Sequence, residues 1–330
     1  MGKKRRIIII AVPLSIGIPL LAAALAFVFR PPVLMVSDPV FDSLYGVLRG
    51  RIKQAEVSIR LWRRVKTVRI ADDAGEDVAV FTVRSAAETP FCVLFPYRYY
   101  NEAKRYAGEA PGIPVAVFRG RVRDPSEPVA AENFHILGTD SVLDFYRAGQ
   151  CAAIFAQSGS AVKRKVSPDG ESAEEGESPV SVENEPGEVF LLQDDLVSDG
   201  DRDAFSRGLA EKGHERTPVY QNAGTAFTPR PNTACVVTSG AAQNFLEQSL
   251  DIPVLLFSWL DPALTPARIK LIFDDSPWAL AVPAVKIIGR QGEAGTMQDI
   301  PSEIRLLSRR INERERLGNI RRAIRSQYIP

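Results

Sequence analysis

Histidine and cysteine are scarce in this chain of 330 residues. His135 and His214 are its two histidines, so a metal site with several histidines or a histidine-based catalytic triad is hard to build. Three cysteines fit neither a disulfide framework nor a cysteine-rich zinc module. We therefore predict no resident metal and no cofactor.

An excess of charge is also missing, because 41 Lys and Arg residues stand against 40 Asp and Glu residues. Phosphate binding needs a basic excess, so a nucleic-acid partner is not expected. No G-x-S-x-G elbow and no glycine-rich phosphate loop occur. Asp194-Asp195 and Asp274-Asp275 are paired acids, but adjacent side chains point apart and cannot share one substrate atom. We interpret both pairs as turns at strand ends. The sequence thus predicts no catalytic residues and a protein that is not an enzyme.

One long apolar run is present near the N-terminus. Lys3–Arg6 precede the uncharged run Ile7–Phe29, and Arg30 closes it. At about 1.5 Å per residue the run reaches about 34 Å, enough for a bilayer core of about 30 Å. The charges place the N-terminus in the cytoplasm, which predicts a single-pass inner-membrane protein with its bulk periplasmic or extracytoplasmic. Ala24-Leu25-Ala26 leaves a cleaved signal peptide as the alternative, and both readings export the chain.

Two segments differ in composition from the rest. Residues 163–188 are acidic and almost free of apolar side chains, which predicts a disordered surface insertion; an acidic docking loop is the alternative. The tail, residues 311–330, is basic and carries a narrow apolar stripe, which suits a helix on anionic lipid, on a partner or packed on its own domain. In an oxidising compartment Cys151 could pair with Cys235, although three buried free thiols are the simpler reading.

Apolar runs with the pattern of buried strands alternate with helical periodicity from residue 33 onward. This order is typical of parallel sheets covered by helices on both faces. The expected strands are residues 33–36, 65–70, 91–95, 115–118, 134–137, 189–192, 219–220, 235–238, 252–258, 270–273 and 304–307. The expected helices begin near residues 43, 75, 99, 141, 202, 240 and 276.

Three stretches in this order resemble the type I periplasmic binding proteins and the ligand-sensing domain of lac-repressor-like regulators. Phe91–Pro96, a helix and Gly112–Phe118 are similar to an early strand, helix and "IPVV" strand of that family. Gly138-Thr139-Asp140 looks like its "GTD" element. Ile252–Asp261, followed by Ile300–Arg309, looks like its late "P…vvGFD" and terminal strands.

The resemblance implies two similar doubly wound parallel-sheet lobes joined by a hinge, with ligand enclosed between them. Residues 33–138 and 268–298 would form the first lobe, and residues 139–267 and 300–310 the second. The family often places an arginine just before the helix near residue 205, where this chain has Asp201 and then Arg202. No helix-turn-helix precedes the first strand, so a repressor role is excluded.

Ligands of such sheets lie beyond the carboxyl ends of the strands, where aromatic faces and fixed polar groups can hold a small polar solute. Candidates at these positions are Asp38, Phe41, Tyr97, Asp140, Arg202, Trp259 and Asp261. Capping or hinge contacts are the structural alternative for the two acids Asp140 and Asp261, lobe packing for Trp259, and core packing for Phe41 and Tyr97.

The resulting prediction is an anchored extracytoplasmic receptor for a sugar, nucleoside or amino acid, attached to the inner membrane through residues 7–29. It would pass its solute to a permease or report occupancy to a membrane sensor. The alternative is a scaffold or interaction protein that kept the fold without a ligand.

Overall fold

A computed structural model of the chain describes most of two α/β units. The described residues are 19, 21–37, 39–71, 74–121, 131–162, 187–222, 225, 227, 228, 230, 232–239, 252–257, 269–290, 297–306 and 324. The first unit contains residues 1–138 and 280–300, and the second contains residues 139–279 and 301–330. The chain therefore passes between the units after Gly138, Ala279 and Ile300.

The first unit is built on a six-stranded sheet in the order β11-β5-β4-β3-β1-β2. The pairs β5–β4, β4–β3, β3–β1 and β1–β2 are all parallel. The strands are β1 (Val33–Val36), β2 (Val65–Val68), β3 (Cys92–Pro96), β4 (Val115–Gly120), β5 (Phe134–Thr139) and β11 (Met297–Ile300). The helical segments after β1 include α2 (Pro39–Leu61), α3 (Glu76–Ala86), the short η1 (Tyr97–Tyr99), α4 (Tyr100–Glu109) and α8 (Pro277–Gly289), whose first three residues belong to the second unit.

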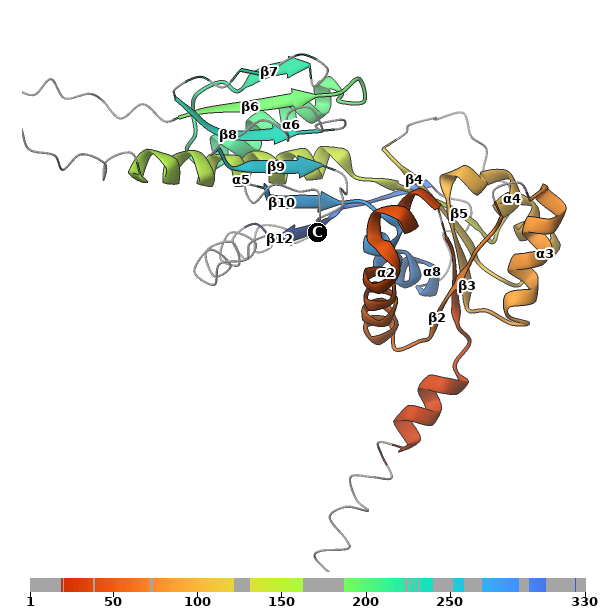
Figure 1. Ribbon diagram of the computed structural model, residues 1–330. Coiled ribbons are helices and arrows are strands. Elements are labelled where there is room, and N and C mark those ends of the chain that lie inside the picture. Colours follow the sequence, from red (N-terminus) through yellow and green to blue (C-terminus); the bar gives the residue numbers. More distant parts are fainter. Residues whose placement is uncertain are drawn as a thin grey trace, which may run out of the picture. The chain divides into compact units, whose positions relative to one another are not determined.

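Helices cover both faces of this sheet, with α3 and α4 on one face and α2 and α8 on the other (Figure 1). Successive side chains of a strand point to opposite faces of the sheet. Since helices cover both faces, every residue of β3 is buried. Val93 and Phe95 pack with Val83 of α3 and Tyr106 of α4 in one core cluster. The continuous apolar runs of the sequence are thus the signature of a sheet covered on both sides.

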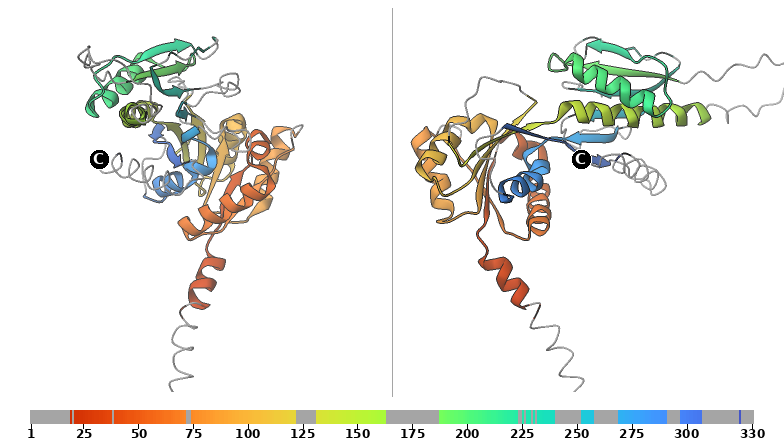
Figure 2. Two further views of the ribbon diagram at one scale, coloured as in Figure 1. Left: turned by 60° about the vertical axis from the view of Figure 1, so that its left-hand side comes forward. Right: turned by 180° about the vertical axis from the view of Figure 1, so that it is seen from behind.

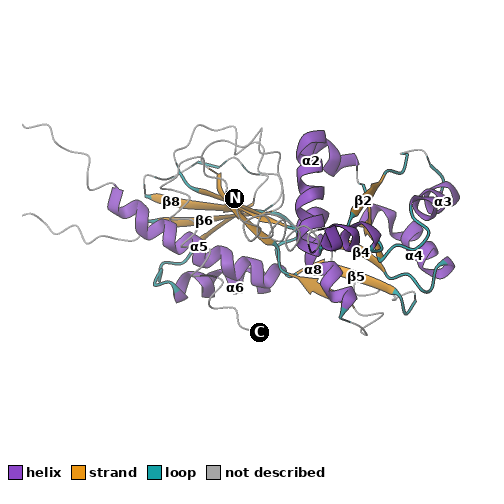
Figure 3. Cartoon of the chain, turned by 90° about the horizontal axis from the view of Figure 1, so that it is seen from below, coloured by secondary structure: helices purple, strands orange, loops and turns teal. Residues whose placement is uncertain are grey.

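The second unit has a six-stranded sheet in the order β12-β10-β9-β8-β6-β7. It is parallel except for β12, which runs antiparallel to β10. The strands are β6 (Glu188–Gln193), β7 (Val219–Asn222), β8 (Thr233–Thr238), β9 (Val254–Phe257), β10 (Ile269–Asp274) and β12 (Glu303–Leu306). Its described residues include the helices α5 (Ser141–Val162) and α6 (Asp199–Glu211), which lie side by side along one face of the sheet (Figures 2 and 3).

Two glycines let α5 and α6 approach until their backbones touch. A Cβ atom built on Gly149 would lie 2.1 Å from the backbone oxygen of Phe205, and one built on Gly208 would lie 2.1 Å from that of Tyr146. Both obstacles are helix backbone, so no side chain can move aside to relieve the overlap. The helices therefore bury the second core against the sheet only because both positions lack a side chain.

Polar groups in the second unit hold the last passage of the chain in place. Asp144 is fully buried and accepts the backbone N–H of Ser302 at 3.1 Å and 3.2 Å. Asp274 is also buried, accepts the N–H of Ser276 at 3.0 Å and pairs with Arg305 at 2.8 Å. The strand-end turn expected for Asp274 is confirmed.

Several element bounds differ from the sequence predictions. Residues 269–279, assigned to the first lobe, form β10 and the start of α8 in the second unit, and Ile300 belongs to the first unit. The strand β11 was missed, because its four residues include Gln298 and Asp299 and carry no apolar run. Glu188, assigned to the acidic insertion, begins β6 and is buried in ion pairs with Arg216 and Arg230; residues 163–186 lie outside the described residues.

The predicted membrane span falls largely outside the described residues. Residues 21–29 are helical, whereas residues 1–18 and 20 are not described. Within the described ranges no helix has both the length and the apolar character needed to cross a bilayer. In the basic tail only Ile324 is described, and it is buried in the core of the second unit, as the reading of a tail packed on its own domain expects.

All three cysteines are buried free thiols, as the simpler reading predicted. Burial raises the pKa of Cys92 and of Cys151 to about 12, and it raises the pKa of Cys235 as well. The thiols are therefore protonated and unreactive in the folded protein.

Substitution of either close-packed glycine should destabilise the second unit. Gly208→Ala forces the α5 and α6 backbones apart, and such overpacking costs about 1–3 kcal/mol of unfolding free energy. Urea titration followed by thiol labelling of Cys151 and Cys235 measures it. The control is Gly200→Ala in α6 of the same unit, where a Cβ would meet only Ser198 Oγ, at 3.8 Å, so stability should rise by about 0.4–1 kcal/mol. Equal stability of the two variants would contradict the close packing.

His214 should make the protein less stable in mild acid. The ring is buried, neither nitrogen has a hydrogen-bond partner among the described residues, and burial together with the Arg216 cation lowers its pKa. Below about pH 6.5 the histidine of the unfolded chain binds a proton, whereas the buried ring of the folded chain stays neutral. The free energy of unfolding therefore decreases as the pH is lowered. In urea titrations between pH 7 and pH 5, His214→Phe should lose less stability than the wild type. Parallel losses would show that His214 is not the group responsible.

Candidate ligand-binding site

The strand order of the second unit defines one place where the winding reverses. The chain leaves β6 for β7 on one side, whereas β8 lies on the other side of β6. In open parallel sheets the loops diverge at such a point, and ligands bind there beyond the carboxyl ends of the strands. Gln193 ends β6 and Thr238 ends β8, so these ends are the geometric candidate for a site.

Hydrogen bonds join the two strand ends at this point. The backbone N–H of Ser239 donates to the oxygen of Leu192 at 2.9 Å, and the N–H of Asp194 donates to Ser239 Oγ at 3.2 Å. The Thr238 hydroxyl is buried without a hydrogen-bond partner among the described residues. A rigid, polar strand end of this kind suits the recognition of hydroxyl or amine groups.

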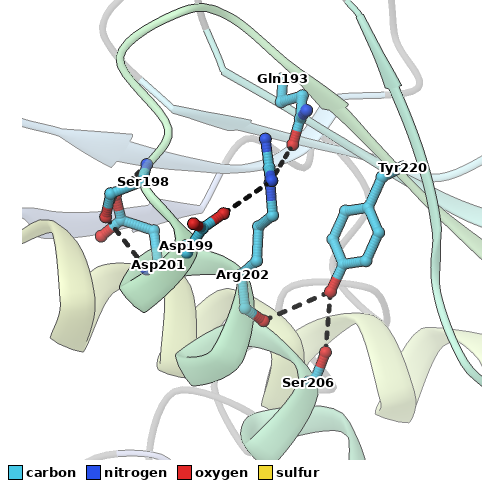
Figure 4. A network of polar contacts seen from close by, with 7 residues as sticks. All are labelled: Gln193, Ser198, Asp199, Asp201, Arg202, Ser206 and Tyr220. Carbon is cyan, nitrogen blue, oxygen red and sulfur yellow. Dashed lines mark hydrogen bonds and ion pairs between the residues drawn. The ribbon is translucent and has the colours of Figure 1, made fainter.

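The first turn of α6 is fixed by a capping box (Figure 4). Asp201 donates its backbone N–H to Ser198 Oγ at 3.3 Å, and Asp201 Oδ2 accepts the N–H of Ser198 at 2.9 Å. Asp201 is buried at 2% exposure. The residue that occupies the family's arginine position therefore stabilises the helix start.

Arg202 follows the cap and extends toward the end of β6 (Figure 4). Its Nε donates to Gln193 Oε1 at 2.8 Å, and its Nη1 donates to Asp199 Oδ1 at 2.8 Å. The guanidinium carbon lies 6.0 Å from the centre of the Tyr220 ring, and the side chain remains 36% exposed. A guanidinium carries five N–H donors in a rigid fork, so donors beyond these two bonds can meet ligand oxygens.

Tyr220 supports this arginine from the edge strand β7. Its hydroxyl lies 2.8 Å from Ser206 Oγ and donates to the backbone oxygen of Arg202 at 3.3 Å (Figure 4). The ring is thereby held against α6. The arrangement fixes the direction of Arg202 before any ligand arrives, which reduces the entropy lost on binding.

The equivalent reversal in the first unit lies between β1 and β3. Ser37 follows β1 and donates its N–H to the oxygen of Val68 at 2.8 Å. Tyr97 follows β3, is half-buried, and packs on the core of this unit with its ring 5.9 Å from that of Tyr100. The candidate Tyr97 thus combines its position at a strand end with the core contact that the alternative reading expected.

The remaining candidates have other positions. Asp140 Oδ1 accepts the N–H of Leu143 at 3.0 Å, which is the helix-capping role set beside ligand binding in the sequence analysis. Phe41 lies in the first turn of α2, and its side chain is outside the described residues, as are Asp38, Trp259 and Asp261. Arg202 is the candidate that the described structure places in a polar network at a reversal point.

Polar residues that the sequence analysis missed also lie at strand ends. Gln193 is the last residue of β6, and Arg119 follows the apolar run of β4. Arg119 is buried and pairs with Asp299 of β11 at 3.1 Å. Gly138 permits this pair, because a Cβ there would lie 2.1 Å from Asp299 Oδ1. The rule of looking just beyond each apolar run would have found both residues.

A shallow depression of about 500 Å³ lies elsewhere on the first unit. Its lining includes Glu76 of α3 and Lys104 and Arg105 of α4. Arg105 is engaged there by Asp77 and by Glu109 at 3.0 Å. Because these exposed ion pairs satisfy one another, we give the depression no role in ligand binding.

Comparison with known proteins places the fold. The sequence matches no family profile and no curated protein sequence. Among solved structures, a transcriptional activator of the comK gene from Bacillus halodurans aligns at 12% identity over 91% of this chain and 100% of its own, with a TM-score of 0.50.

The arabinose-binding protein AraP from Geobacillus stearothermophilus aligns at 15% identity, over 89% of this chain and 99% of its own, with a TM-score of 0.48. A periplasmic solute-binding protein of an ABC transporter from Actinobacillus succinogenes, solved with D-allose, aligns at 14% identity over 84% and 98%, with a TM-score of 0.45.

The chain has the type I periplasmic-binding-protein fold. This is the fold that the resemblance in the sequence predicted. The three solved structures are described as binding proteins or a regulator, and none of them as an enzyme. At this level of identity the likeness establishes the fold alone.

Loss of the capping box and loss of the Arg202 side chain should have different effects on the free energy of unfolding. Ser198→Ala removes the cap of α6 and should cost about 0.5–2 kcal/mol of unfolding free energy. Arg202→Gln removes a partly exposed side chain and should change stability by at most about 0.5 kcal/mol. Urea titration of both variants checks this. A larger loss in Arg202→Gln would make that arginine a structural residue.

Proposed function

We propose that the protein is a membrane-anchored, extracytoplasmic solute-binding protein. It encloses a small polar molecule (a sugar, a nucleoside or an amino acid) between its two lobes, for uptake through a permease or for sensing by a membrane partner. Its anchor is the apolar segment of residues 7–29, and no covalent chemistry is involved. The triple passage of the chain between two doubly wound units supports lobe closure as the binding movement.

The observation that carries the proposal is the arrangement of Arg202 at the β6–β8 reversal. The guanidinium is oriented by Gln193 and Asp199, it remains partly exposed, and its helix is fixed by a capping box. Charge-assisted hydrogen bonds from such a group contribute about 1.5–3 kcal/mol each. Ligand oxygens at this strand end would therefore gain both affinity and orientation.

Ligand binding should appear as thermal stabilisation of the full chain in detergent. A library of sugars, nucleosides and amino acids is screened, and a ligand at a hundredfold excess over its Kd stabilises the folded state by about 2.7 kcal/mol. Arg202→Gln should weaken the binding of any responding solute by about tenfold to a hundredfold, because one charge-assisted bond is lost.

Arg207→Gln is the matched control, since Arg207 lies exposed on the same helix and carries the same charge. It should leave the response unchanged. Equal loss in both variants would assign the effect to charge alone. The absence of any response across the library would favour the alternative, a scaffold protein without a ligand. The side chains that already bond to Arg202 would then be its functional partners.

A further inference from the structure

The first unit has a cationic and aromatic surface where the chain enters it. We call it the base surface and define it by Arg30, Arg60, Trp62, Arg63 and Arg64. Between residues 57 and 71 the sequence holds five cations and no acid. Glu56, one turn earlier, pairs with Arg60 at 3.7 Å and with Lys53. The local charge of this surface is strongly positive even though the whole chain is nearly neutral.

Trp62 occupies a backbone position that normally belongs to glycine. It follows the last residue of α2 with a φ of 52°, in the left-handed region. The N–H of Trp62 donates to the oxygen of Ile59 and that of Arg63 donates to Ser58, which is the glycine-type termination of a helix. A bulky residue there costs about 1–2 kcal/mol, yet the side chain remains 45% exposed. Strain at an exposed aromatic residue indicates a use for that residue outside the core.

Contacts tie Trp62 to the end of the apolar N-terminal segment. Its ring lies 5.6 Å from the ring of Phe27, edge to face, and its backbone oxygen accepts Arg30 Nη1 at 3.5 Å. Arg63 Nη1 donates to the oxygen of Pro31 at 3.4 Å. Only three residue steps separate Arg30 from the start of β1 at Val33, a reach of about 10 Å. Trp62 therefore lies level with the last helical turn of the apolar N-terminal segment, and the two would reach the same depth in a bilayer.

Arg60 of this surface pairs with Glu56, whereas Arg30 and Arg63 have no acidic partner among the described residues. Arg30 and Arg63 both donate to backbone oxygens, and Arg63 also stacks on the Phe91 ring at 4.0 Å. Burial and the neighbouring Arg30 cation lower the pKa of Arg63. Guanidiniums gathered in this way attract an anion, and the exposed Phe29 and Val28 beside them attract a hydrocarbon phase.

We propose that the base surface rests on anionic phospholipid, with the Trp62 ring at the level of the headgroups and the arginines on lipid phosphates. Tryptophan is enriched at this level of a bilayer, and basic residues near an anionic surface add to membrane binding. The inference rests on the proposed anchor, because that segment brings the surface to the membrane. This contact would hold the first unit in a fixed orientation on the bilayer surface.

The test places the full chain in vesicles whose lipid chains are brominated, which quench nearby tryptophan. Trp62 is isolated by subtracting the emission of Trp62→Phe from that of the wild type. In vesicles containing phosphatidylglycerol the Trp62 emission should be quenched and shifted to the blue. In pure phosphatidylcholine, or at high salt, most of the quenching should be lost. Unquenched Trp62 emission in chains that float with anionic vesicles would overturn the proposal.

Paired variants separate charge from structure. Arg60→Gln with Arg63→Gln should lose the quenching, Arg60→Lys with Arg63→Lys should retain it, and Arg84→Gln with Arg290→Gln, exposed elsewhere on the first unit, should leave it unchanged. Equal effects of the two glutamine pairs would contradict a lipid-binding base surface.

Flotation distinguishes this proposal from the anchor itself. Chains recovered without their N-terminal segment would refute the anchor, and the base surface is then tested alone by sedimentation with anionic vesicles. Binding should weaken by about fivefold for each cation removed and should depend on Trp62. Binding that is insensitive to these residues would refute the base surface as well.

Discussion

The right-handed crossover between parallel strands is the constraint on which this structure depends. It forces each helix onto a defined face of its sheet, so a change of winding direction leaves one gap between the loops beyond the strand ends. In the second unit that gap lies between β6 and β8, and in the first between β1 and β3. Arg202 and Tyr97 lie at these two positions because of the strand order, whatever their chemistry.

Much of the fold could be predicted from the sequence, because both sheets are covered on each face and their strands are continuous apolar runs. Residues 33–36 and 92–96 show this directly, since all of them are buried. The pattern could not reveal β11, whose polar residues lie at a sheet edge, or the membership of β10, since an apolar run does not state which sheet it joins.

The candidate site was less predictable, for physical reasons. The rule for strand ends selected Arg202 and Asp140 alike, but the Asp140 side chain accepts the N–H of Leu143 in α5, whereas Arg202 is oriented by Gln193 and Asp199. Whether a strand-end residue caps the following helix depends on the conformation of the loop that joins the strand to that helix. The close packing at Gly149 and Gly208 was likewise invisible, because only the crossing of α5 and α6 gives these glycines a role.

Hydrogen exchange of the full chain, with and without a solute that stabilises it, tests the central claim most directly. If ligand binds at the reversal points, protection should increase in residues 193–202 and 236–239 of the second unit and around Ser37 and Tyr97 of the first. Protection confined to the depression between α3 and α4, with unchanged exchange at both reversal points, would contradict the account.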